Sequence, residues 1–154
     1  MPIESKDMTE LRRGRETEVL AEDARLLLQE LEREVPGAAM TSGECRPSLD
    51  VVDTATAIEI VMDVPGVPAS ALRVSVRQNT VLVVGAKVAP STPADVRFHV
   101  AERSSGRFAR GIRLSGSVDA GRARAFVEAG LLRVVLPRVE NRRGQAISVP
   151  VTSA

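Results

Sequence analysis

The spacing of apolar residues changes once along the chain, near residue 37, and this change limits the folds open to it. Before that point, apolar side chains recur at steps of three and four, at Leu20, Ala24, Leu27, Leu28 and Leu31. This is the period of a helix with one apolar stripe. After that point, short segments alternate apolar and polar residues, as half-buried strands do. The pattern therefore predicts one helix followed by a β-domain.

The predicted helix covers residues 8–35 and ends at Val35-Pro36-Gly37. Its apolar stripe is narrow, so the helix must lie on another surface or pair with a second copy of itself. Residues 1–35 carry 10 acidic and 6 basic side chains, a net charge of −4. A helix that binds membranes would carry Lys and Arg on its polar face. The acidic composition therefore favours a surface helix or a dimerising helix.

After a polar linker over residues 37–46, alternation predicts strands that end at turn residues. Gln78-Asn79 joins two of them as a hairpin. Short strands with a turn roughly every 8 to 12 residues, and no helical pattern between them, indicate an antiparallel β-sandwich. The predicted strands are 58–64, 72–77, 80–85, 96–100, 108–114, 123–127 and 131–136.

The inventory of reactive side chains is small. Cys45 and His99 are the only cysteine and histidine, so they supply neither an internal disulfide nor a zinc ligand set. No serine lies in a G-x-S-x-G sequence, and the glycines after Gly111 lack the residues of a phosphate loop. We therefore expect a protein that is not an enzyme and has no cofactor and no metal.

Charge and hydropathy also limit the partners. The whole chain has a net charge of +1 and only three aromatic residues, all Phe, which disfavours nucleic-acid binding. No stretch approaches about 18 consecutive apolar residues, and the first residues lack the apolar core of a signal peptide. We expect a cytoplasmic protein that does not bind membranes.

One arginine lies where alternation predicts apolar side chains. Phe108, Arg110, Ile112 and Leu114 share one face of the predicted strand 108–114. A buried guanidinium needs a carboxylate or several carbonyl groups, because an unpaired buried charge costs several kcal/mol. Its partner is either a carboxylate inside the sandwich or a group across a subunit interface. The residues by themselves leave both interpretations open.

The chain ends in a polar segment that contains an apolar island. We expect an N-terminal arm over residues 1–46, a β-sandwich over 47–137 and a flexible tail over 138–154. Ile147 and Val149 project to the same side of an extended strand. Such a pair can fill a groove at the edge of a sheet, and the candidate edge strands are 72–77 and 132–136.

Five segments, which make up four motifs in this order, resemble the small heat-shock proteins, the family of the α-crystallin domain, especially its bacterial members. RPSLDV at 46–51 and MDVPGV at 62–67 are similar to W-x-P-x-x-D and D-x-P-G-V, although the tryptophan is missing. ERSSGRFARGIRL at 102–114 is similar to E-R-x-x-G-x-F-x-R-x-F-x-L. AFVEAGLL at 125–132 is similar to A-x-x-x-N-G-V-L, with Ala129 in place of Asn, and ISV at 147–149 is similar to I-x-I/V.

The resemblance implies an all-β, immunoglobulin-like antiparallel β-sandwich of the α-crystallin type, with a helical N-terminal arm and an extended C-terminal tail. It implies a dimer in which Arg110 stabilises the interface and strand 96–100 exchanges onto the partner's sheet. The tail then crosses to a neighbouring dimer and builds larger oligomers. The implied dimer residues are Arg110, Val96, Phe98 and Val100; the tail residues are Ile147 and Val149; and the groove residues are Val74, Val76, Leu132 and Val134.

The resemblance also implies an ATP-independent holdase chaperone that binds unfolding client proteins. In many relatives a Phe-rich arm binds the clients, but residues 1–46 of this chain contain no aromatic residue. We therefore expect the client contacts to come from the helix, at Leu20, Leu27, Leu28 and Leu31, and from the β-edges. The alternative is a non-catalytic β-sandwich adaptor or co-chaperone that docks one defined protein partner.

Overall fold

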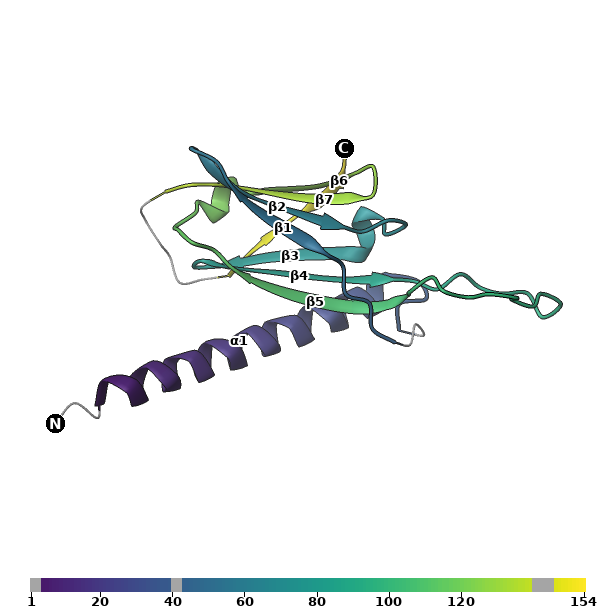
Figure 1. The fold of residues 1–154 in the computed structure, drawn as a ribbon, viewed down its shortest axis with the longest axis horizontal. Coiled ribbons are helices and arrows are strands. Elements are labelled where there is room, and N and C mark those ends of the chain that lie inside the picture. The colour runs from purple at the N-terminus through teal and green to yellow at the C-terminus, as the bar shows by residue number, and fades with distance from the viewer. Residues whose placement is uncertain (1–3, 40–42, 140–145) are drawn as a thin grey trace.

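The computed structural model describes residues 4–39, 43–139 and 146–154. It consists of a long helix beside a β-sandwich, from which one loop projects (Figure 1). The helix is α1 (Glu4–Glu34), and two short 3-10 helices are η1 (Ala69–Ala71) and η2 (Ala120–Arg122). The strands are β1 (Leu49–Asp53), β2 (Ala57–Asp63), β3 (Leu72–Arg77), β4 (Thr80–Lys87), β5 (Gly106–Arg113), β6 (Arg124–Glu128), β7 (Leu131–Pro137), β8 (Ala146–Val149) and β9 (Val151–Ser153).

The strands of the described residues form two sheets that pack face to face. One sheet has the order β1-β2-β7-β6-β9, and the other has the order β5-β4-β3-β8. Every strand pair is antiparallel except β6 with β9. The predicted all-β sandwich with an N-terminal helix is confirmed.

The core lies between the sheets, where alternate residues of each strand point inward. In the first sheet, Ile60 of β2 lies opposite Val134 of β7, and both are fully buried. In the second sheet, Val74 of β3 lies opposite Val83 of β4, and both are buried. Burial of these apolar side chains on both inner faces holds the sheets together.

Helix α1 lies along the outer face of the β5-β4-β3 sheet (Figure 1). Because of this position, β4 is buried on both of its faces. Val81 and Val83 point into the sandwich core, while Leu82, Val84 and Ala86 are buried outside that core, on the side of the helix. The nearly continuous apolar sequence of β4 follows from this double burial.

One predicted strand is wrong. Residues 96–100 form no strand; they belong to the projecting loop between β4 and β5 (Figure 1). A strand needs a neighbour for its backbone hydrogen bonds, and none lies beside this loop in the chain. The tail is extended, as predicted, and carries β8 and β9, which pair with β3 and β6; its flexibility stays a prediction.

Candidate functional site

The tail motif lies at the edge of the four-stranded sheet of its own chain. β8 pairs with β3 so that Val149 lies opposite Val74 and Ile147 lies opposite Val76. Val149 is 5% exposed and belongs to the core, whereas Ile147 is 40% exposed. A tail tethered to the sandwich meets its own edge at a high effective concentration. Its binding to a neighbouring dimer therefore stays a prediction.

After β8 the tail crosses to the other sheet. Pro150 separates the two tail strands, and β9 then pairs in parallel with β6, with Val151 opposite Ala125. The tail therefore closes the side of the sandwich at which β3 and β6 are the outermost strands of the chain's main domain. Backbone groups on both of these strands, which would otherwise be open to other chains, are covered in this way.

One predicted edge strand is wrong. β7, which carries Leu132 and Val134, lies between β2 and β6, and both side chains are fully buried in the core. The edge strand is β6, whose Ala125 is buried and whose Val127 packs partly against the core. The two strands form a hairpin of similar apolar alternation, and this alternation does not tell which of them lies outside. Val74 and Val76 lie on β3 and pair with the tail of the same chain; that they accept the tail of a neighbouring dimer stays a prediction.

Arg110 lies half-buried on the face of β5 that also carries the buried Phe108 and Ile112. Its Nη1 donates a hydrogen bond of 2.6 Å to the backbone oxygen of Pro47. Among the described residues, no carboxylate forms an ion pair with it. The bond joins β5, in one sheet, to the segment that leads into β1, in the other. Its role in a dimer stays a prediction.

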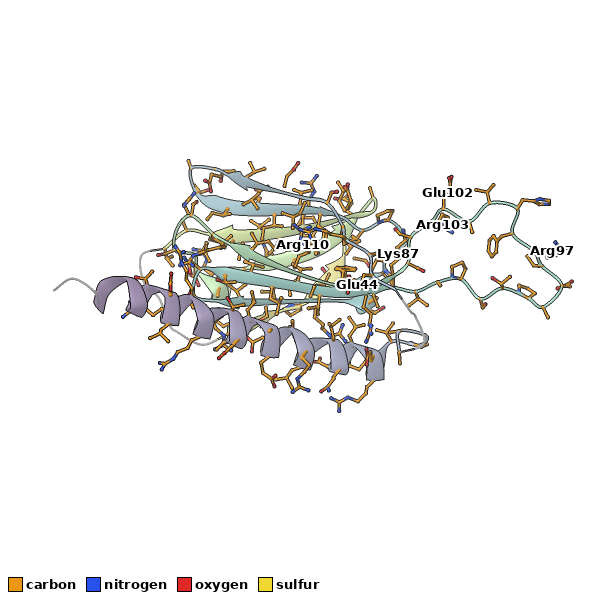
Figure 2. All side chains as sticks on the ribbon, turned by 60° about the horizontal axis from the view of Figure 1, so that its bottom comes forward. Glu44, Lys87, Arg97, Glu102, Arg103 and Arg110 are labelled. Atoms are coloured by element: carbon orange, nitrogen blue, oxygen red, sulfur yellow. The ribbon has the colours of Figure 1, made fainter. Side chains whose placement is uncertain are left out.

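The loop between β4 and β5 presents apolar side chains to solvent. Val96 is 48% exposed, Phe98 63% and Val100 71%. Arg97, Glu102 and Arg103 lie on the same projecting loop, as Figure 2 shows. The alternation of these three apolar residues fits a strand that lacks a neighbour in its own chain.

The outer strand β1 offers a sheet edge of the same chain. In the described residues β1 pairs with β2 and with no other strand, so its second edge is open. Val51 and Val52 of β1 are exposed. An unpaired edge with exposed β-branched side chains is a template for a further strand.

The four leucines predicted to contact clients face the sheet. Leu31 is fully buried, in a cluster with Ala38 and Ala86, and Leu20, Leu27 and Leu28 are half-buried. In this arrangement they are covered by the sheet. Client contact through them would require α1 to leave the sheet.

Groups of other chemistry are few in the described residues. Cys45 is half-buried, and burial raises the pKa of its thiol, which the nearby Lys87 partly opposes. No group of three or more His, Cys, Asp or Glu side chains in the described ranges is placed to hold a metal ion. Within those ranges, no helix has the length and apolar character that a membrane span requires.

Comparisons with known proteins agree on one family. Residues 50–152 match the Hsp20/alpha crystallin family. The "18.9 kDa heat shock protein" of Oryza sativa subsp. japonica is 32% identical over 107 residues, 69% of this chain and 60% of that protein. A second rice relative, the "16.6 kDa heat shock protein", is 32% identical over 68% of this chain and 72% of its own length. The chain thus spans less than two thirds of the first of these relatives.

Solved structures give the same result. Heat shock protein 16.0 from Schizosaccharomyces pombe superposes with a TM-score of 0.59 and 28% identity, over 66% of this chain and 94% of that one. The hspA protein from Xanthomonas axonopodis superposes with a TM-score of 0.57 and 25% identity, over 62% and 96% of the two chains.

Proposed function

Because the chain belongs to the Hsp20/alpha crystallin family, whose small heat-shock proteins are non-enzymatic chaperones, we propose that it is an ATP-independent holdase. It binds partly unfolded proteins and keeps them from aggregating. One observation carries this proposal: apolar surfaces of the sandwich are covered by the chain's own terminal segments, α1 and the tail. A cytoplasmic location stays a prediction from the sequence.

The covered surfaces suit the holding of unfolded chains. When β8 leaves β3, the edge presents free backbone groups together with Val74 and Val76, which is a site for an extended apolar segment. Apolar contact of this kind is non-directional and strengthens on moderate warming. Holding therefore needs no nucleotide.

We further propose a homodimer in which strand 96–100 of each subunit pairs with β1 of the other. The exposed Val96, Phe98 and Val100 and the open edge of β1 support this pairing. Arg110 supports it indirectly, since its hydrogen bond to Pro47 holds the chain that leads into β1. Larger oligomers form when the tail motif, Ile147 and Val149, occupies the β3–β6 edge of a neighbouring dimer.

The test of the chaperone role is light scattering from a heat-aggregating client protein in the absence of ATP. We expect suppression at an equimolar ratio of subunits to client, and none from the same mass of a protein of unrelated fold. Full aggregation at that ratio would overturn the proposal. If Ile147→Ala/Val149→Ala leaves both particle size and suppression unchanged, the adaptor or co-chaperone alternative is favoured.

A further inference from the structure

The outer face of the β5-β4-β3 sheet is an apolar trough. Its floor is formed by Leu82, Val84 and Ala86 of β4, which alternate with the residues that face the core. Small residues flank Leu82 in the sheet, with Ser75 of β3 on one side and Gly111 of β5 on the other. The absence of large side chains at these two positions leaves room for a helix to lie along β4.

Two rows of arginines flank this trough. Arg73 and Arg77 lie on β3, and Arg107 and Arg113 lie on β5. Arg77 and Arg113 are aligned across the sheet, because both lie opposite Thr80 of β4. The two rows are two strand spacings apart, about 9.5 Å. This separation matches the width of an α-helix, about 10 Å with its side chains.

Helix α1 carries acidic side chains on both flanks of its leucine stripe, and these pair with both rows. Arg73 pairs with Glu30, at 3.4 Å, and with Glu34. Arg77 pairs with Asp23 at 3.1 Å, Arg113 pairs with Glu16 at 3.3 Å, and Arg107 pairs with Glu32. The stripe thus lies over the apolar floor, and the acids reach the arginines on each side.

The contact between α1 and the trough is incomplete. All five ion pairs have at least one partner that is substantially exposed, and exposed pairs contribute little to stability. Leu20 packs closely against the sheet at Gly111. A Cβ added to Gly111 would lie 2.7 Å from Cδ2 of Leu20. Around this point a cleft of about 420 Å³ remains between the helix and Leu82. A helix held in this way is open to replacement by another.

We propose that the arginine-flanked trough is a docking surface for acidic amphipathic helices, which α1 occupies until a helix of the same kind in an unfolding client displaces it. The charge on both rows and their spacing specify the occupant, since an extended strand is too narrow to reach both rows at once. The inference rests on the proposed holdase function for the origin of the displacing helix, and it defines a class of client.

Two fluorescent peptides probe the trough of the full chain. The acidic probe has the sequence of residues 8–35. The basic probe keeps its apolar residues and exchanges every acidic residue for Lys and every basic residue for Glu. Glu30→Lys/Glu34→Lys places two lysines against Arg73 and loosens α1 without altering the trough. Glu10→Lys/Glu18→Lys makes the same change of charge at acids of α1 that have no ion pair in the described residues.

Fluorescence anisotropy then measures probe affinity. We expect the acidic probe to bind Glu30→Lys/Glu34→Lys about tenfold more tightly than the unchanged chain, because a larger fraction of its troughs is open. Glu10→Lys/Glu18→Lys should bind it as the unchanged chain does. The triple variant that adds only Arg73→Glu restores opposite charges between positions 30, 34 and 73 and keeps the Arg77–Asp23 pair, so α1 covers the trough again and the affinity for the acidic probe should fall to the unchanged level or below it.

Reversal of one row provides a further control. Arg73→Glu/Arg77→Glu alone should bind the basic probe in preference to the acidic one. Arg124→Glu/Arg133→Glu, on the other sheet, should leave both affinities unchanged. Equal binding of both probes to all variants, or no binding to any, would overturn the inference. If the unchanged chain still suppresses client aggregation in that case, the holdase proposal stands; probe binding without suppression would overturn only the holdase proposal.

Discussion

Ala129 holds a backbone conformation that asparagine and glycine adopt more readily. Its φ is +51°, and Gly130, which follows it in the β6–β7 turn, has φ of +76°. Two successive residues with positive φ form the turn that matches the twist of a hairpin, and a Cβ in this region costs about 1 kcal/mol. The A-x-x-x-N-G-V-L motif of the small heat-shock proteins has asparagine at this position.

We therefore expect Ala129→Asn to raise the free energy of unfolding by about 0.5–1 kcal/mol, because asparagine tolerates the left-handed region. Urea denaturation monitored by circular dichroism measures the change. Ala55→Asn is the control, since Ala55 is exposed in the β1–β2 turn and does not have a positive φ. Equal effects of the two substitutions would contradict the prediction.

Arg110 is a residue whose place was predictable and whose partner was not. Alternation along 108–114 puts it on the apolar face, and the structure has it there, half-buried. Its partner is a backbone oxygen 63 residues away, at Pro47. The path of the linker before β1 has no hydrophobic period, so no local pattern identifies this carbonyl group.

Arg110→Ala should lower the free energy of unfolding by about 2 kcal/mol, since it removes a hydrogen bond from a charged donor and leaves a carbonyl group without it. If β1 receives the partner's strand, the variant should also dissociate at higher protein concentrations. Thermal unfolding and sedimentation velocity measure the two effects. Arg110→Lys, which keeps a charged donor, should recover part of both, and Arg124→Ala on the exposed face of β6 should change neither.

The helices and strands with a strong hydrophobic period could be predicted from the sequence. The helix and the strands from β2 to β7 lie within a few residues of their predicted ranges. β1 is mostly exposed, so it carries little alternation, and it was expected only from the resemblance of residues 46–51. Whether the tail and segment 96–100 form strands depends on which sheet edge lies beside them. Such an edge is a property of the assembled sheets rather than of the local sequence.

The two apolar residues of the tail motif should contribute unequally while β8 stays on its own chain. Val149→Ala removes two buried methyl groups, worth about 1.5 kcal/mol, whereas Ile147 is 40% exposed and loses less buried surface when truncated. We expect Val149→Ala to speed amide hydrogen exchange in β8 roughly tenfold, and Ile147→Ala to change it much less.

Dilution distinguishes the two locations of the tail. If β8 lies on its own chain, its exchange rate should be independent of protein concentration. If it lies on a neighbouring dimer, exchange should accelerate on dilution, and Ile147→Ala should then have an effect similar to that of Val149→Ala. The β2–β7 ladder serves as an internal reference in both measurements, because neither of its strands pairs with the tail.

At the scale of the whole molecule, folding and assembly use different surfaces. The core between the sheets and the packing of α1 on β4 are both formed within a single chain. The apolar side chains of the projecting loop are exposed, and within the described residues β1 pairs with no strand besides β2. Substitutions in the loop should therefore change assembly and leave the folding of the single chain nearly unchanged.

Phe98→Asp tests this separation. If segment 96–100 pairs with β1 of a second subunit, the variant would bury a charge at that interface, which costs several kcal/mol, so it should sediment as a monomer at concentrations where the unchanged chain is a dimer. Thr92→Asp makes the same change of charge in the same loop, outside the segment, and should leave the dimer intact. The far-ultraviolet circular dichroism of the Phe98→Asp monomer should match that of the unchanged chain, because Phe98 is 63% exposed and contributes nothing to the core. A dimer that survives Phe98→Asp would mean that the subunits associate through another surface, and the open edge of β1 would then need a different partner.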